Sequence, residues 1–215
     1  MKAIQITAFG GPDVMKYVDL ANPVAGTDEV VLDVTAVGIN YADTHQTENS
    51  YLSPQTLPMI PGIEVVGTHA GKRYLASVSS GGYAQKAIAH TSVLFPIPDV
   101  VTDEQALCML VQGATAWHLL KTMGNLQKGQ SVVVHAAAGG VGTIAIQLAK
   151  MWGGKVIAVT SSDAKAALAK SLGADVTVDA QSSDLTAAIR EANGGHGVDL
   201  VLEMVGGTTF DHSLA

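Results

Sequence analysis

The segment that most restricts the fold of this chain is residues 131–150. Three β-branched residues at 132–134 predict a buried strand, and a turn of alanine and glycine follows them directly. Apolar residues then recur at helical spacing over 141–149, which predicts a helix with one buried face. A strand, a glycine-containing turn and a helix in this order can hold a dinucleotide pyrophosphate. Because glycine has no side chain, the phosphates can approach the backbone closely, and the helix N-terminus offers free N–H groups.

The turn itself reads Ala137-Ala-Gly-Gly-Val-Gly142, with alanine where many such turns have their first glycine. Folds that bind flavins or methyl donors use similar turns, so the motif alone is weakly specific. A doubly wound domain without a dinucleotide therefore stays open as an alternative. The residues predicted to surround the phosphates are Ala138, Gly139, Gly140, Val141 and Gly142.

Three further apolar runs follow the turn, at 155–159, 175–178 and 198–202, with helical patterns at 163–172 and about 182–192 between them. Strands that alternate with helices of this length form βαβ units around a parallel sheet. Unbroken apolar runs are typical of strands that are covered on both faces. We therefore predict an α/β fold whose second part is a Rossmann-type, doubly wound parallel sheet.

The first part of the chain has the pattern of a separate, all-β domain. Alternation over 29–38 places Val30, Leu32, Val34 and Ala36 on one face of a strand. Further short strands are predicted at 63–67, 73–78 and 83–88.

Two helices are predicted between the two parts of the chain. A capping box, Thr102-Asp-Glu-Gln105, begins a helix that runs through Leu110, and a second helix covers about 116–123. We place the boundary within 113–125, which divides the chain into domains 1–120 and 121–215.

Composition excludes several classes of protein. A net charge of −7 without a basic run argues against nucleic acid as a partner. The single cysteine, Cys108, allows no internal disulfide and fits a reducing cytoplasm, and its apolar neighbours predict a core position. The N-terminus enters a strand pattern without a secretion signal. Because no stretch of about 18 residues is apolar throughout, a membrane span is not expected.

Seven short motifs are spread over the whole chain: Met1-Lys-Ala-Ile4, Phe9-Gly-Gly-Pro12, Val37-Gly-Ile-Asn-x-x-Asp43, Pro61-Gly-x-Glu64, Gly81-Gly-Tyr-Ala84, Ala136-Ala-x-Gly-Gly-Val-Gly142 and Leu172-Gly-Ala-Asp175. Together they resemble the zinc-independent quinone oxidoreductases, which include the zeta-crystallins and belong to the medium-chain dehydrogenase/reductase superfamily. Two features differ from the family pattern. Residues 68–73 form a shorter connection, and the chain stops at residue 215, where family members normally continue.

The resemblance implies a GroES-like β domain followed by a partial Rossmann domain that binds NADPH. The implied reaction is hydride transfer from NADPH to quinones or other α,β-unsaturated carbonyl compounds, in a cytoplasmic homodimer when the protein is full length. Two alternatives stay open. One is an enoyl-thioester or alkenal reductase on the same scaffold, and the other is a cofactor-binding protein with little catalysis.

No metal is expected. Zinc-dependent relatives use a cysteine after the strand at 30–38 and a histidine before the glutamate, but this chain has Asn40 near the first position and Ile63 at the second. Cys108 is the only thiol, whereas a zinc site needs three or four ligands in closed geometry.

Four residues after the strand at 29–38 are catalytic candidates by resemblance: Asn40, Asp43, His45 and Tyr51. The amide of Asn40 would face the nicotinamide and the substrate, although Asn40 could equally be the N-cap of a helix over 41–48. Tyr51 matches the proton donor of related enoyl reductases, or is only a pocket wall. His45 replaces a tyrosine of the family and could act as an acid, or could be a solvated helix residue.

The resemblance also assigns cofactor contacts outside the turn. Thr115, in the loop Gln112-Gly-Ala-Thr115, is expected beside the cofactor, and Val205 is a further candidate. After the second strand of the nucleotide domain, Thr160, Ser161 and Lys165 offer hydroxyls and a cation for a 2′-phosphate, which favours NADPH over NADH. Asp163 argues mildly for NADH. The family's Asn-Tyr-Arg is Asp-Ala-Gln here, at 179–181, which weakens the NADPH preference.

The last predicted strand, 198–202, has a consequence for the whole chain. In the usual Rossmann order the fourth strand pairs with the first and is flanked by a fifth. Because this chain stops soon after its fourth strand, an apolar strand would become a bare sheet edge. We therefore expect these 215 residues to be part of a longer polypeptide, or to pair this edge with a neighbouring chain.

Overall fold

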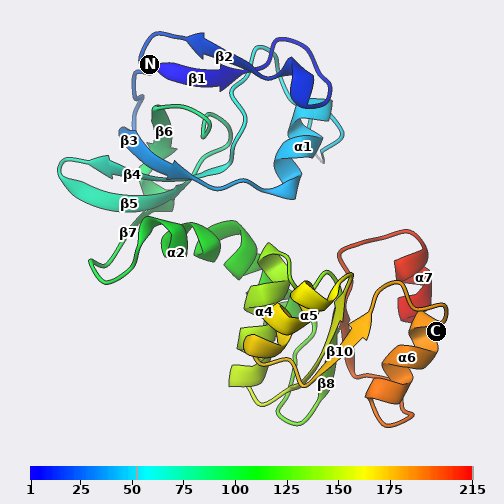
Figure 1. Ribbon diagram of the computed structural model, residues 1–215. Coiled ribbons are helices and arrows are strands. Elements are labelled where there is room, and N and C mark those ends of the chain that lie inside the picture. The colour runs from blue at the N-terminus through cyan, green and yellow to red at the C-terminus, as the bar shows by residue number, and fades with distance from the viewer. Residues whose placement is uncertain (52, 215) are drawn as a thin grey trace. The chain divides into compact units, whose positions relative to one another are not determined.

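The computed structural model describes residues 1–51 and 53–214 (Figure 1). The chain forms two compact units, Met1–Val111 and Gln112–Ala215. This division lies nine residues before the predicted boundary between 120 and 121. The difference arises because the helical residues that follow Gln112 belong to the second unit. Ala116 and Leu120 are buried there in one cluster with Ile146.

The first unit is built from two antiparallel sheets. A five-stranded sheet has the order β6-β3-β4-β5-β7, and a two-stranded sheet pairs β1 with β2. Leu32, Val65 and Ala76 lie at the centre of its main core. The elements are β1 (Lys2–Gln5), η1 (Pro12–Val14), β2 (Lys16–Asp19), β3 (Glu29–Val37), α1 (Tyr41–Glu48), β4 (Glu64–His69), β5 (Lys72–Ser77), β6 (Lys86–His90), η2 (Thr91–Val93), β7 (Leu94–Pro96) and α2 (Asp103–Cys108).

One face of β3 differs from the prediction. The register against β4 shifts between Val34 and Ala36, and such a bulge moves the following side chains to the opposite face of the sheet. Val30 and Val34 pack with Leu32, as predicted, but Ala36 packs on the other side with Val66.

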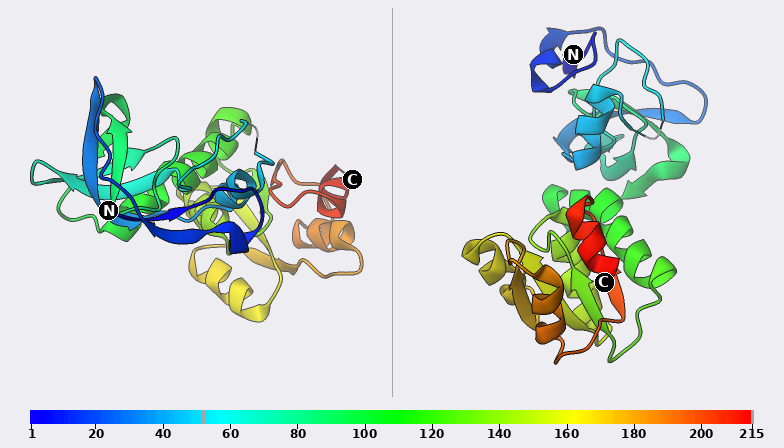
Figure 2. Two further views of the ribbon diagram at one scale, coloured as in Figure 1. Left: turned by 90° about the horizontal axis from the view of Figure 1, so that it is seen from above. Right: turned by 90° about the vertical axis from the view of Figure 1, so that its right-hand side faces the viewer.

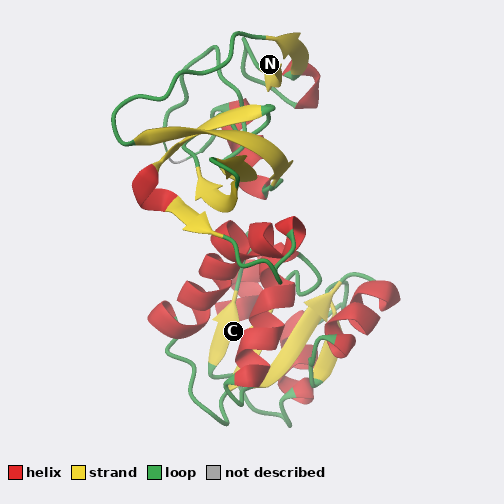
Figure 3. Cartoon of the chain, turned by 90° about the vertical axis from the view of Figure 1, so that its left-hand side faces the viewer, coloured by secondary structure: helices red, strands yellow, loops and turns green. Residues whose placement is uncertain are grey.

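The second unit contains a parallel sheet of four strands in the order β10-β9-β8-β11. The fourth strand therefore pairs with the first, as predicted. Helices cover both faces of this sheet (Figure 3), because alternate residues of β8 enter different clusters: Val132 packs with Ile146 of α4, and Val133 packs with Ile189 of α6. The elements are β8 (Ser131–Val134), α4 (Gly140–Met151), β9 (Lys155–Thr160), α5 (Asp163–Ser171), β10 (Val176–Asp179), α6 (Leu185–Ala192), β11 (Leu200–Leu202) and α7 (Thr208–Leu214).

The helix that follows β11 lies beside its predecessor. In Figure 2, α7 (red) and α6 (orange) are neighbours, and the Thr186 hydroxyl donates to the carbonyl oxygen of His212 at 3.1 Å. This contact ties the last described helix to the second unit.

The segment from α2 onward is more helical than predicted. The turns of η3 (Met109–Gly113), α3 (Ala114–Trp117) and η4 (His118–Met123) follow α2 directly. Residues 112–115 are therefore helical, and the loop expected there is absent from the described chain. The predicted core position of Cys108 is also wrong: the thiol is exposed, because α2 directs Ala106 into the core instead.

Candidate functional site

The turn after β8 is closed so tightly that one position requires glycine. A Cβ atom added at Gly142 would lie 2.6 Å from the carbonyl oxygen of Ala136 and 2.7 Å from the Cα of Ala137. Ala136 itself has a positive φ of 46°, which bends the chain at the end of the strand. Gly139 is the N-cap of α4, so the first N–H groups of a 12-residue helix open onto the turn.

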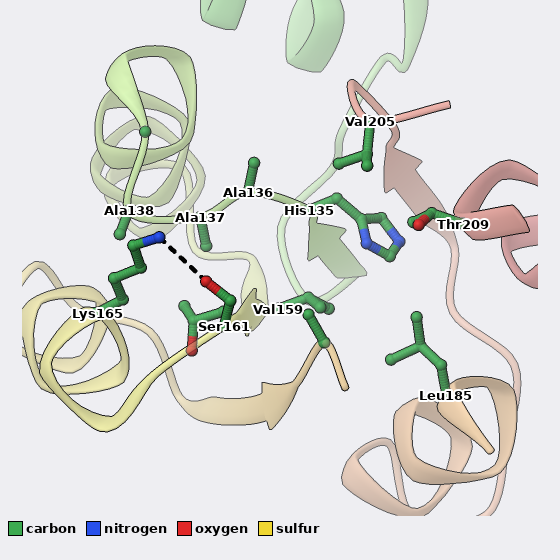
Figure 4. A pocket seen from close by; sticks show the side chains of 13 residues that line it. His135, Ala136, Ala137, Ala138, Val159, Ser161, Lys165, Leu185, Val205 and Thr209 are labelled. Atoms are coloured by element: carbon green, nitrogen blue, oxygen red, sulfur yellow. Dashed lines mark hydrogen bonds between the residues drawn. The ribbon is translucent and has the colours of Figure 1, made fainter. Parts of the chain in front are cut away.

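A cavity of about 340 Å³ lies against this turn (Figure 4). Six predicted cofactor residues line it: Ala138, Gly139, Thr160, Ser161, Lys165 and Val205. The cavity lies at the carboxyl ends of β8 and β9, which is where open parallel sheets bind ligands. The prediction thus located the cavity from the turn and from the end of the second strand.

Four other predicted cofactor residues do not line the cavity. Gly140, Val141 and Gly142 form the first turn of α4, where they shape the backbone behind the cavity. Thr115 lies in α3 and is half-buried rather than exposed in a loop.

One side of the cavity carries hydroxyls and a cation. The Lys165 Nζ donates to Ser161 Oγ at 3.0 Å, a contact drawn as a dashed line in Figure 4. Asp163 and Asp179 line a neighbouring hollow of about 240 Å³, which shares Thr160 with the cavity. The cavity wall at 160–165 therefore presents Thr160, Ser161 and Lys165 but no carboxylate.

Sequence reasoning missed other residues that line the cavity: His135, Ala136, Ala137, Val159, Ala180, Leu185 and Thr209. His135 directly follows β8, so its place at the end of a buried strand was a usable signal. Burial lowers the pKa of its imidazole, and the nearby Glu203 acts in the opposite direction. Its Nε2 lies 3.2 Å from Ser213 Oγ.

The position of Val205 has a local cause. The Glu203 carboxylate accepts the backbone N–H of Val205 at 2.7 Å and that of Gly206 at 3.1 Å. These bonds hold the loop after β11 in the conformation that directs Val205 to the cavity (Figure 4).

The residues around the cavity fit a dinucleotide phosphate. Three features favour the binding of an anion here: a turn too tight for a Cβ atom at Gly142, the N-terminus of α4, and the ammonium group of Lys165. The apolar wall formed by Val159, Leu185 and Val205 suits a flat ring or a sugar edge rather than a second charge.

The first unit contains a second polar cluster, which joins Asn40, Asp43, Glu64 and Tyr83. Asn40 is the N-cap of α1 and forms a capping box with Asp43, as one of its two predicted roles required. Its backbone N–H donates to Asp43 Oδ2 at 2.8 Å, and its Nδ2 donates to Glu64 Oε1 at 2.8 Å. The Tyr83 hydroxyl donates to Asp43 Oδ2 at 2.7 Å.

Burial dominates the electrostatics of this cluster. It raises the pKa of Glu64, against the N–H bonds from Asn40 and Val111, while the nearby Asp43 raises it further. Burial, together with the bond to Asp43, also raises the pKa of Tyr83. Among the residues that the structure describes, Asp43 Oδ1 and Gln46 Oε1 are buried without a hydrogen-bond partner.

The other two catalytic candidates have no printed bond to this cluster. His45 lies on α1, with its Nδ1 2.9 Å from Ser50 Oγ and its ring edge-on to Tyr41. Tyr51 follows α1 and is 40% exposed. The structure therefore links Asn40 and Asp43 directly, and adds Glu64 and Tyr83, which sequence reasoning did not select.

Neither a metal cluster nor a membrane span is found in the described part of the chain. No three His, Cys, Asp or Glu side chains among residues 1–51 and 53–214 are grouped as metal ligands. Within the same residues, no helix has the length and apolar character needed to cross a bilayer.

The parallel sheet, its glycine turn and the preceding antiparallel unit define the class of protein. A GroES-like unit followed by a Rossmann-type unit is the architecture of the medium-chain dehydrogenases and reductases. Residues 26–71 match the alcohol dehydrogenase GroES-like domain, and residues 140–215 match the family described as zinc-binding dehydrogenase.

Individual relatives narrow this class. The chain is 33% identical to a quinone oxidoreductase of Pseudomonas aeruginosa, over 99% of this chain and 69% of the relative. It is 38% identical, with a TM-score of 0.89, to the quinone oxidoreductase of Thermus thermophilus, whose complex with NADPH is known, over 98% of this chain and 69% of that one. The Escherichia coli quinone oxidoreductase complexed with NADPH is 30% identical, with a TM-score of 0.92, over 100% and 69%. The chain therefore belongs to the quinone oxidoreductases of the medium-chain dehydrogenase/reductase superfamily.

Proposed function

We propose that this protein transfers hydride from NADPH to quinones or other α,β-unsaturated carbonyl compounds, without a metal ion. The observation that carries the proposal is the cavity beside the glycine turn, whose wall includes Ser161 and Lys165 but not Asp163. Two related quinone oxidoreductases have been solved with NADPH, which supports the same cofactor here.

The second unit supplies the residues that bind the cofactor. The N-terminus of α4 would meet the pyrophosphate, since the first turn of a helix presents N–H groups and positive dipole, while the Gly139 N–H closes the turn by donating to Ala136 O at 2.8 Å. Thr160, Ser161 and Lys165 meet the 2′-phosphate as donors. When bound, NADPH supplies the hydride for the reaction.

The first unit supplies the group that acts on the acceptor. Negative charge builds on the acceptor's carbonyl oxygen during reduction, and a fixed N–H donor stabilises that charge. We assign this role to the side-chain amide of Asn40, a residue that is 7% exposed. Asp43 holds the Asn40 backbone, while Tyr51 or solvent delivers the proton.

NADPH oxidation by the purified protein, measured against quinones, enals and enoyl thioesters, tests the proposal. Turnover with quinones supports it, and turnover confined to enoyl thioesters would reassign the substrate class. Tight NADPH binding without turnover of any acceptor would contradict an enzymatic role and favour a cofactor-binding protein.

Replacing Lys165 by glutamate should weaken NADPH binding by about 1.5–3 kcal/mol, which is about 10-fold to 100-fold in Kd, because a charged contact to the 2′-phosphate becomes repulsive. NADH binding should change little. Titration calorimetry with both cofactors measures this difference. Lys170→Glu makes the same charge change in α5 away from the cavity and should leave both affinities unchanged. Equal losses for NADPH and NADH would rule out this role for Lys165.

Replacing Tyr51 by phenylalanine removes only a hydroxyl and should separate two acceptor classes. If Tyr51 is a proton donor, turnover with enoyl substrates should fall about 100-fold, whereas quinone reduction should change little. Steady-state rates with both classes measure this. The same small effect on both would show that Tyr51 only lines the site.

The protein should contain no stoichiometric metal after purification from metal-replete medium. Ile63 stands where zinc-dependent relatives have a ligand, and Asn40 Nδ2 donates to a carboxylate. Elemental analysis together with activity after chelation measures this. One zinc per chain, with activity lost to the chelator, would refute the proposal.

We propose further that the protein acts in the cytoplasm, as a homodimer when it is full length. One exposed thiol, Cys108, suits a reducing compartment. Light scattering during size-exclusion chromatography measures the assembly, and a monomer at all concentrations would contradict a dimer.

A further inference from the structure

The Glu64 carboxylate is completely buried at the start of β4, yet none of the roles proposed above uses it. It accepts two hydrogen bonds. The Asn40 Nδ2 donates to Oε1 at 2.8 Å, and the backbone N–H of Val111 donates to Oε2 at 3.1 Å. Burying a carboxylate is costly, and a residue that only filled space here could be apolar. The two bonds therefore indicate a task that an apolar side chain could not perform.

The backbone beside the carboxylate is shaped to admit it. A Cβ atom added at Gly38 would collide with Glu64 Oε1 and would lie 2.6 Å from its Cγ. Gly38 also donates its backbone N–H to the Glu64 carbonyl oxygen at 3.2 Å, so the two residues are held together across β3 and β4. Because Gly38 lies only two residues before Asn40, the carboxylate and the amide share one confined space.

The chemistry of the two side chains decides how the amide is oriented. An amide has an oxygen that accepts and a nitrogen that donates, and the two ends are nearly equal in shape. A carboxylate accepts hydrogen bonds on both oxygens. Glu64 therefore requires that Nδ2 of Asn40, and not Oδ1, faces it. That contact also restrains the amide, and with it the direction of the second hydrogen on Nδ2.

Asp43 restrains the same residue from the other side. Its Oδ2 accepts the backbone N–H of Asn40, and the Tyr83 hydroxyl holds that oxygen in place. Asp43 thus fixes where the Asn40 backbone lies, whereas Glu64 fixes how its side chain is turned. The two acids are not equivalent, and only Glu64 contacts the amide nitrogen.

We infer that Glu64 is a positioning residue for carbonyl reduction: it orients the Asn40 amide so that an N–H group is presented to the acceptor oxygen. This inference rests on the proposed function, and in particular on Asn40 as the donor. Glu64 itself does not touch the acceptor. It acts through Asn40 alone, so its effect on turnover must disappear when Asn40 is removed.

Glu64→Gln tests the inference with almost no change of shape. Glutamine must direct its NH₂ group either at Asn40 Nδ2 or at the Val111 N–H, and both are donors. We expect the turnover number for quinones to fall about 10-fold to 100-fold, because a misoriented Asn40 N–H group stabilises the transition state less. The NADPH affinity, measured by calorimetry, should stay unchanged.

A second variant and a control guard against simple misfolding. Glu64→Met keeps the length of the side chain and removes the donor conflict, but cannot orient the amide, so turnover should fall as in Glu64→Gln. Asp103→Asn alters another carboxylate of the same unit, one bonded to Thr35 and Arg73, and should leave the turnover number unchanged. Thermal unfolding of each variant shows whether it is folded.

A double-mutant cycle with Asn40→Ala supplies the decisive readout. If Glu64 acts through Asn40, adding Glu64→Gln to Asn40→Ala should lower turnover no further, whereas independent effects would multiply. Multiplying effects, or a folded Glu64→Gln protein with wild-type turnover, would overturn the inference. A wild-type protein that reduces no quinone would refute the proposed function, and with it the role of Glu64. If the wild-type protein reduces quinones but the effects in the cycle multiply, only the role of Glu64 is refuted.

Discussion

Replacing Gly142 by alanine should lower the affinity for NADPH by about 5-fold to 150-fold, because the turn has no room for the added methyl group. The added Cβ atom would lie 2.6 Å from Ala136 O, 2.7 Å from Ala137 Cα and 2.8 Å from Ala137 C. All three atoms belong to the backbone of the turn, so no flexible side chain can move away. The turn must open, and strain of about 1–3 kcal/mol then falls on the backbone that holds the phosphates.

Calorimetric titration with NADPH measures this loss, and circular dichroism shows whether the second unit stays folded. Gly197→Ala is a matched control in the same unit, because a Cβ atom there meets nothing within 4 Å. Its NADPH affinity should equal that of the wild type. A folded Gly142→Ala protein that still binds NADPH normally would show that the turn does not carry the cofactor.

Replacing Asn40 by alanine should lower the turnover number for quinones by about 100-fold, while NADPH affinity stays nearly constant. Loss of a single fixed donor to a developing oxyanion costs about 100-fold to 1,000-fold in other enzymes. The substitution also removes the N-cap of α1, at a cost of about 1 kcal/mol in the free energy of unfolding. The loss of the Asn40 bond should raise the pKa of Glu64 still further.

The two roles of Asn40 can be separated with a second cap. Thr102 caps α2 in the same unit, and its hydroxyl accepts the Gln105 N–H at 3.2 Å, away from the acidic cluster. Thr102→Ala should therefore lower stability, measured by urea unfolding, without lowering turnover. If Asn40→Ala reproduces that pattern, with stability lost and kinetics intact, Asn40 is only a cap.

The fold of the second unit could be predicted because each of its signals is local. Unbroken apolar runs indicate buried parallel strands, and the turn at 137–142 identifies the first of them. The observed order β10-β9-β8-β11 follows from that assignment. The boundary between the units was harder to predict, because Ala116 and Leu120 belong to the second unit through tertiary packing and not through any break in the sequence.

The candidate site could be predicted only in part, because its key contacts join distant residues. The sequence comparison with zinc-dependent relatives drew attention to Asn40, near the position of a ligand, and to Glu64, next to the position of another. It did not indicate that the two side chains are hydrogen-bonded to each other. Their contact depends on the register between β3 and β4, which includes a shift between Val34 and Ala36. A shift of this kind has no strong sequence signal. Leu185 and Thr209 line the cavity for a similar reason, since they reach it from elements late in the chain.

The close fit of Gly38 against Glu64 also constrains how these two positions can vary among related sequences. A methyl group at 38 would lie 2.6 Å from the Cγ of residue 64, so even the shorter aspartate would collide with it in the present χ1 rotamer. A side chain at position 38 therefore requires residue 64 to adopt another χ1 rotamer or to be replaced by a smaller residue. Related chains that gain a side chain at 38 should therefore also change the rotamer or the identity of residue 64, and with it the contact that holds the asparagine amide.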